Sequence, residues 1–127
     1  MTWMRSRTRT LIMYHRGDRM FGKHDASGYT KVLDKITRKT LVHGARTLMA
    51  EFRLEQGAVL TKHRHLHEQT GYLVSGSMDL SIGNETHAVS AGDSWCIPGD
   101  VEHSAMARED SVAIEVFCPV REDYLSQ

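Results

Sequence analysis

The stretch GAVLTKHRHLHEQTGYLVSG, residues 57–76, decides the fold and suggests the chemistry. It places three histidines, His63, His65 and His67, at every second position in a run flanked by aliphatic and β-branched residues. Side chains alternate between the two faces of a strand, so this spacing puts all three imidazoles on one side. Imidazole is the commonest metal ligand in proteins. Because Gln69 adds an oxygen donor nearby, the stretch predicts a metal site built on a β-strand.

A second segment, GDSWCIPGDVEH at residues 92–103, ends on another histidine, His103. This residue lies far along the chain from the first three. It can share a metal with them only if the fold returns it to their side, so the predicted site depends on tertiary structure.

The two segments together resemble the motifs of the cupin family. Gly57, His63, His65, Gln69 and Gly76 occupy the positions of the first motif, with Gln69 where most members have glutamate. The second motif is kept in part: Gly92, Pro98 and His103 match, whereas Asp100 and Ala107 replace a glycine and an asparagine. The resemblance, over roughly residues 45 to 118, implies an all-β jelly-roll barrel (a double-stranded β-helix). It also implies a divalent metal ion held by His63, His65, Gln69 and His103.

Composition restricts the possible partners. The chain has 127 residues, enough for one domain with a real core, and equal numbers of basic and acidic residues at 16 each. This balance suggests neither a nucleic-acid nor an anionic-membrane partner. No apolar run approaches the ~20 residues that span a bilayer, and residues 1–19 lack the apolar stretch of a signal peptide. We therefore expect a cytoplasmic protein in which Cys96 and Cys118 are buried thiols rather than a disulfide.

The rest of the chain indicates short strands separated by turns. Residues 46–54 alternate, with Leu48, Ala50, Phe52 and Leu54 on one face. Gly83 and Asn84 predict a hairpin, and no segment has a convincing helical period. We expect a single barrel domain over residues 29–127. Residues 1–28 form an N-terminal arm that either pairs with a neighbouring subunit or is a partly ordered tail.

Several ligand assignments stay open at this level. Gln69 is either a metal ligand or an outer hydrogen-bonding residue, and His67 is more consistent with an outer position or the mouth of the cavity. Glu68 would replace Gln69 if the register shifted by one residue.

A further candidate is Glu115, a carboxylate in the middle of the apolar strand at residues 111–117. Such a group is costly unless it faces water, a cation or a cavity. It either points to solvent or to a subunit contact, or it faces the barrel interior as a general acid or base with a perturbed pKa.

The C-terminal sequence EVFCPVREDYL, together with both motifs, is similar to the KdgF-like group of small cupins. That resemblance implies a sugar-acid substrate, namely ring opening and tautomerisation of 4,5-unsaturated uronates to linear keto-deoxyuronates in pectin or alginate breakdown. It makes Glu115, Phe117 and Arg121 the catalytic residues, with Glu115 where we associate aspartate. It also implies a homodimer. Zinc, nickel, manganese and iron all suit the reaction, because it involves no redox change.

Two other functions stay open. One is an iron-dependent dioxygenase on the same barrel, and the other is a non-catalytic metal- or sugar-binding cupin.

Overall fold

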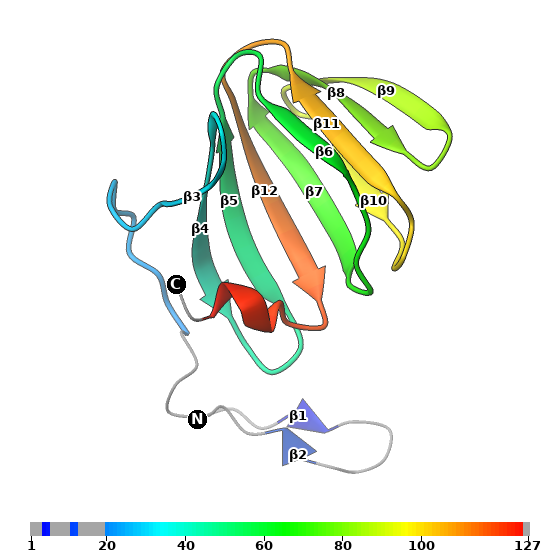
Figure 1. The fold of residues 1–127 in the computed structure, drawn as a ribbon. Coiled ribbons are helices and arrows are strands. Elements are labelled where there is room, and N and C mark those ends of the chain that lie inside the picture. The colour runs from blue at the N-terminus through cyan, green and yellow to red at the C-terminus, as the bar shows by residue number, and fades with distance from the viewer. Residues whose placement is uncertain (1–3, 6–10, 13–19, 126–127) are drawn as a thin grey trace.

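The computed structural model describes residues 4–5, 11–12 and 20–125. Two antiparallel sheets pack face to face (Figure 1), which confirms the all-β prediction. The larger sheet has the order β10-β7-β12-β5-β4-β3. Its strands are β3 (Thr30–Leu33), β4 (Ile36–His43), β5 (Leu48–Leu54), β7 (Glu68–Ser75), β10 (Ser94–Ile97) and β12 (Ser111–Cys118).

The smaller sheet has the order β6-β11-β8-β9. Its strands are β6 (Val59–His63), β8 (Ser77–Ile82), β9 (Glu85–Ser90) and β11 (His103–Ala107). Gly83, in the left-handed region at φ 58°, forms the predicted hairpin between β8 and β9. A single-turn 3-10 helix, η1 (Glu122–Tyr124), follows β12.

Most of the expected N-terminal arm lies outside the described residues. Of residues 1–28, β1 (Met4–Arg5) pairs with β2 (Leu11–Ile12), and residues 20–28 are exposed. The Lys39 ammonium on β4 donates hydrogen bonds to the carbonyls of Asp25 and Ser27, at 2.8 and 2.7 Å. This contact attaches the last part of the arm to the larger sheet.

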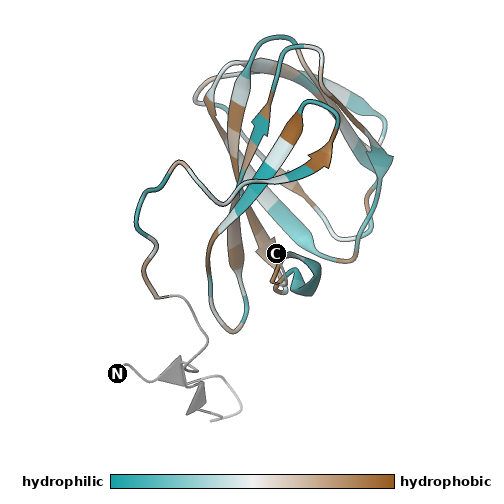
Figure 2. Cartoon of the chain, turned by 60° about the vertical axis from the view of Figure 1, so that its left-hand side comes forward, coloured by the Kyte–Doolittle hydropathy of each residue, from teal (hydrophilic) through white to brown (hydrophobic). Residues whose placement is uncertain are grey.

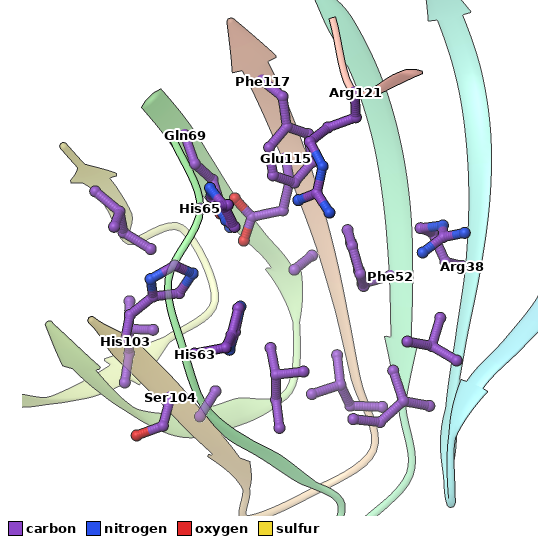
Figure 3. A pocket seen from close by; sticks show the side chains of 18 of the residues that line it. Arg38, Phe52, His63, His65, Gln69, His103, Ser104, Glu115, Phe117 and Arg121 are labelled. Carbon is purple, nitrogen blue, oxygen red and sulfur yellow. The ribbon is translucent and has the colours of Figure 1, made fainter. Parts of the chain in front are cut away.

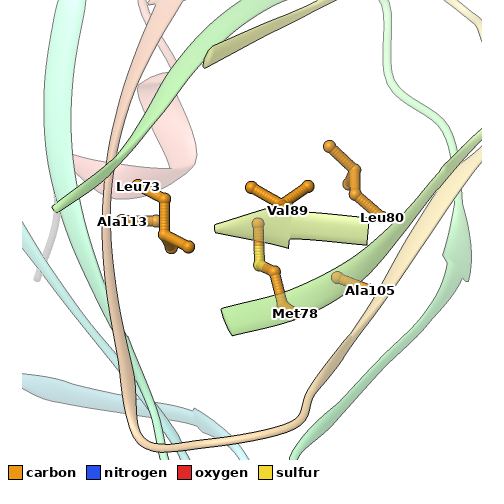
Figure 4. Close-up of a cluster of buried hydrophobic side chains, with 6 residues drawn as sticks. All are labelled: Leu73, Met78, Leu80, Val89, Ala105 and Ala113. Carbon is orange, nitrogen blue, oxygen red and sulfur yellow. The ribbon is translucent and has the colours of Figure 1, made fainter. Parts of the chain in front are cut away.

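Alternating side chains build the interior, as Figure 2 shows by the change of colour along the strands. On β5, Leu48, Ala50 and Leu54 are buried and Phe52 is partly buried, all on the predicted face. A cluster contributed by both sheets (Figure 4) contains Leu73, Met78, Leu80, Val89, Ala105 and Ala113. Burial of these side chains stabilises the packing of one sheet on the other, at roughly 25 cal/mol per Å² of apolar surface removed from water.

One prediction from composition is wrong. Cys96 and Cys118 are free thiols, as expected, but both are exposed. They occupy positions of β10 and β12 that alternate with the buried Ile97 and Phe117, so they face away from the interior. Among the described residues, no helix is long and apolar enough to span a membrane.

The turn after β7 gives a test of the fold. Gly76 has φ 92°, and a methyl group there would overlap Ser111 Oγ and the Asp110 carbonyl. We expect Gly76→Ala to lower the free energy of unfolding by more than the ~1–2 kcal/mol cost of left-handed backbone alone.

Two glycines provide matched controls in denaturant unfolding. Gly92 has φ 95° but open space around it, so Gly92→Ala isolates the backbone cost of ~1–2 kcal/mol. Gly44 has neither feature, so Gly44→Ala should change stability by less than ~0.5 kcal/mol. Equal losses at positions 76 and 92 would show that the contact with Ser111 contributes nothing.

Candidate metal centre and cavity

Strand register brings His63 and His103 together. His63 ends β6, His103 begins β11, and the two residues are direct partners across this antiparallel pair. Opposite residues of such a pair point to the same face, so both imidazoles enter the interior. Their ring centroids are 4.1 Å apart. The fold therefore returns the distant histidine to the first motif, as the prediction required.

His65 joins this pair from the loop that follows β6. Its ring centroid lies 4.9 Å from that of His103 and 5.7 Å from that of His63. One ring nitrogen of each histidine falls within 4.8 Å of those of the other two. The three imidazoles therefore converge on one point from two strands and a loop.

Backbone carbonyls orient all three rings. The Nδ1 atoms of His63, His65 and His103 contact the carbonyl oxygens of Thr61, His67 and Val101, at 2.7, 3.0 and 2.9 Å. A carbonyl oxygen only accepts, so each Nδ1 carries a proton that it donates. The neutral rings then keep their lone pairs on Nε2. This is the arrangement by which outer contacts prepare histidines for a metal.

Burial also keeps two of the rings neutral. It lowers the pKa of His65 to about 4, with smaller contributions from the charges of Arg121 and His103. Burial lowers the pKa of His103 as well. Neutral imidazole is the form that binds metal.

Gln69, the first buried residue of β7, directs its side chain to the same point (Figure 3). Its Oε1 lies 3.1 Å from His65 Nε2. On its other side Gln69 hydrogen bonds to the Glu115 carboxylate. A carboxylate only accepts, so this bond uses the amide nitrogen and leaves the amide oxygen facing the histidines.

These residues fit a divalent metal ion. His103 Nε2 is buried and has no hydrogen-bond partner among the described residues, which is costly unless a cation occupies the space before it. The Gln69 oxygen and the His65 Nε2 lone pair are both acceptors directed at each other, a contact that a cation would make favourable. Three imidazoles and one amide oxygen form the donor set expected from the sequence, and such a set suits several first-row metals.

The alternative ligands lie elsewhere. His67 has its ring centroid 5.5 Å from that of His65 but is not part of the converging group. Glu68 is exposed on the opposite face of β7, where its carboxylate is 3.8 Å from the Cys96 thiol. The register that would exchange Glu68 for Gln69 is therefore not the one observed.

Glu115 faces the interior, which resolves the two alternatives left by the sequence. It is 7% exposed, between the buried Ala113 and Phe117. Burial raises the pKa of its carboxyl to about 8, and hydrogen bonds from Gln69 and Trp95 offset only part of that rise. A group with this pKa can both give and take a proton near neutral pH.

Trp95 orients this carboxyl. Its indole Nε1 donates to both carboxylate oxygens of Glu115, at 3.1 and 3.2 Å. Gly71, the partner of both residues in the sheet, makes the contact possible, because a Cβ there would overlap the indole ring and the carboxylate. The sequence did not identify Trp95 as a residue of the site. No signal within its own strand indicates that it meets a residue of β12 across β7.

Arg121 and Phe117 lie at one end of the same interior. The Arg121 guanidinium is 5.1 Å from the ring centroid of Phe117 and 4.3 Å from that of Tyr124. It donates two hydrogen bonds to Asp123, from Nε to Oδ1 at 3.0 Å and from Nη2 to Oδ2 at 2.8 Å. This pairing holds the pKa of the Asp123 carboxyl below its ordinary value. Asp123 and Tyr124 were not identified from the sequence.

One cavity of about 210 Å³ between the sheets is lined by the three converging histidines and by Gln69, Glu115, Phe117, Arg121, Asp123 and Tyr124 (Figure 3). Pockets for drug-sized ligands measure about 300–1,000 Å³, so this one suits a smaller molecule. Arg38 of β4 also lines it, a residue that the sequence did not single out. Tyr72 of β7 is 49% exposed and faces away from the cavity.

Comparison with known proteins agrees with this geometry. A model of the cupin domain matches residues 50–119. The pectin degradation protein KdgF of Dickeya dadantii (strain 3937) is 29% identical over 103 residues, which cover 80% of this chain and 94% of that protein.

Solved structures support the same relationship. KdgF from Halomonas sp. is 32% identical, with a TM-score of 0.78 over 83% of this chain and 97% of that one. An RmlC-like cupin from Shewanella frigidimarina NCIMB 400 superimposes with a TM-score of 0.79 over 84% of this chain and 96% of that one. At 24% identity, this second match supports the fold alone. The jelly-roll barrel expected from the motifs is thereby confirmed.

Metal content gives the first test of the site. We expect the native chain to bind a divalent metal ion and His103→Ala to lose it, because the substitution removes one of three converging imidazoles. Elemental analysis after loading with zinc, nickel, manganese or iron(II) in turn measures this. His87→Ala, at an exposed histidine on β9, is the matched control and should bind as the native protein does. Equal metal content in both variants would contradict the assignment.

Stability against pH tests the environment of Glu115. In metal-free protein the unfolded chain loses this proton near its ordinary pKa, whereas the folded chain holds it up to about pH 8. Between these values the folded state binds one more proton, so the free energy of unfolding falls as pH rises, by at most about 1.4 kcal/mol per pH unit. Below this range both states are protonated and the effect vanishes.

The variant Glu115→Gln removes that dependence and keeps an acceptor for Trp95. The free energy of unfolding of Glu115→Gln minus that of the native protein should therefore grow from about pH 5 to pH 8. All other titrating groups cancel in this difference. A difference that does not change with pH would mean that Glu115 is not buried in neutral form.

Proposed function

This chain belongs to the cupin family, and we propose that it is a metal-dependent enzyme acting on a small sugar acid. The observation that carries the proposal is one small cavity holding three converging histidines, a carboxyl with a pKa of about 8 and an arginine. A metal-binding group and a proton-transferring group beside the same space are what an enzyme of this class needs. The likeness to the two KdgF proteins, one of them named for pectin degradation, supports a uronate as substrate.

The reaction that fits best is ring opening of a 4,5-unsaturated uronate followed by tautomerisation. Such a substrate is a cyclic hemiacetal whose ring oxygen belongs to an enol ether. When the anomeric hydroxyl loses its proton, its electron pair forms the C1 carbonyl and the bond from C1 to the ring oxygen breaks. The enolate left across C4 and C5 takes a proton at C4, which gives a linear keto-deoxyuronate. Atoms and electrons balance without an oxidant or reductant.

Glu115 is the residue that moves these protons. Its carboxyl is protonated in much of the population at neutral pH, so it can deliver a proton at C4 and recover one from the anomeric hydroxyl. Trp95 and Gln69 hold it in one orientation, which lowers the entropy cost of reaching the reactive geometry. The ion held by His63, His65, His103 and Gln69 would supply Lewis acidity toward substrate oxygens.

Phe117 and Arg121 complete the proposed site. Phe117 is fully buried, and its ring lies 5.8 Å from that of His65, so it excludes water next to the metal ligands. Arg121 lies at the same end of the cavity and is paired with Asp123; Arg38 and Arg121 against that one carboxylate leave a net positive charge that favours an anionic substrate. The donor set is compatible with zinc, nickel, manganese or iron.

A turnover assay tests this function. We expect metal-loaded protein to remove the enol absorbance of 4,5-unsaturated galacturonate or glucuronate, and chelation to abolish the activity. Glu115→Gln should lower kcat by about 10²- to 10⁴-fold, because it cannot transfer a proton. Glu85→Gln, at an exposed position of β9, is the matched control and should retain full activity.

Two outcomes would favour the other functions. Oxygen consumption with iron, absent with zinc, would identify a dioxygenase. Binding of uronates that Glu115→Gln leaves intact, with no turnover of any of them by the native protein, would identify a binding protein.

A further inference from the structure

We infer that Arg38 of β4 binds the carboxylate of the sugar acid and thereby selects acidic over neutral sugars. The inference rests on the proposed function in one respect, because it takes the ligand to be a sugar acid. It concerns a residue on the opposite side of the cavity from the histidines (Figure 3).

The position of Arg38 in the sheet is that of a core residue. It lies two residues after the fully buried Ile36 and directly opposite Phe52 of β5, and it is 7% exposed. Burying a guanidinium is costly unless carboxylates or other acceptors satisfy its five donors. A core position that served only packing would be expected to hold an apolar side chain.

Arg38 has no carboxylate as an ion-pair partner in the part of the chain that the structure describes. Its guanidinium carbon lies 3.6 Å from the ring centroid of Tyr124. The guanidinium lies over the face of that ring, and its five donors exceed what Tyr124 can accept, so donors remain for another acceptor. Because Arg38 lines the cavity, the free donors are available to a ligand there.

Arg121 differs in this respect. Its Nε and Nη2 atoms are already engaged in a two-point contact with Asp123, which also lines the cavity. Asp123 is the carboxylate nearest to both arginines, so Arg38, Arg121 and Asp123 together carry one net positive charge, and Arg38 is the arginine whose donors are not engaged by Asp123. A planar guanidinium with free donors binds a carboxylate through two parallel hydrogen bonds.

Size and charge together define the ligand. The cavity of about 210 Å³ admits a small molecule, and one net positive charge matches one carboxylate. A monosaccharide acid satisfies both conditions. With its carboxylate on Arg38, the rest of the ring extends toward Glu115 and the histidines.

Calorimetric titration with galacturonate and with galactose tests the inference on the protein as purified. Galacturonate has the carboxylate but no 4,5 double bond, so it reports binding without the proposed reaction. We expect the native protein to bind galacturonate more tightly than galactose. Arg38→Met keeps the length and the apolar contact with Tyr124, and it should weaken galacturonate binding at least tenfold while leaving galactose binding unchanged.

Two further variants make the result decisive. Arg38→Lys retains the charge but not the two-point geometry, and it should bind galacturonate with intermediate affinity. Arg46→Met, at an exposed arginine, is the matched control and should bind as the native protein does.

The inference is wrong if the native protein does not prefer galacturonate, or if Arg38→Met keeps that preference. It is also wrong if Arg38→Met loses both sugars equally, since the role would then be support of Tyr124. Should Arg38→Met fail to fold, unchanged galacturonate affinity in Arg38→Lys would overturn it. The proposed function is judged separately by the turnover assay. If galacturonate binding depends on Arg38 but no uronate is turned over, the proposed reaction is wrong and the role of Arg38 stands.

Discussion

The pairing of β6 with β11 is the constraint on which the site depends. It sets His63 directly opposite His103, and the two rings approach within 4.1 Å. A shift of one residue in this register would turn one of the histidines to the outer surface. The flanking contacts oppose such a shift, because β11 is also paired with β8 over its full length. The smaller sheet thus fixes two of the three converging histidines, while His65 comes from the loop after β6 and Gln69 from the larger sheet.

Much of this could be predicted from the sequence because strand alternation is a local property. It predicted the inward face of β5, but it left the orientation of Glu115 open between solvent and the interior. The histidine ligands required family motifs as well, since periodicity says nothing about which distant strand is a neighbour. Contacts that cross a third strand were not predictable in either way. Trp95 reaches Glu115 over Gly71, and Arg38 reaches Tyr124 from a strand far along the chain.

The cavity combines groups that burial affects in opposite ways. Burial lowers the pKa of His65 and His103 and raises that of Glu115, so all three favour their neutral forms. Burial does not make the arginines neutral, because a guanidinium stays charged under all ordinary conditions. The cavity therefore holds neutral imidazoles and a neutral acid together with two fixed guanidinium charges, those of Arg38 and Arg121. This combination favours an anionic molecule in the cavity over a neutral one.

The missing side chain at Gly71 has an evolutionary consequence. An indole edge from β10 and a carboxylate from β12 fill the space that a Cβ would need. No one of these three positions can acquire a larger or differently shaped residue without disturbing the other two. Among homologous barrels, we therefore expect positions 71, 95 and 115 to diverge together. Families that abandon the buried acid should be the ones in which the glycine is also free to change.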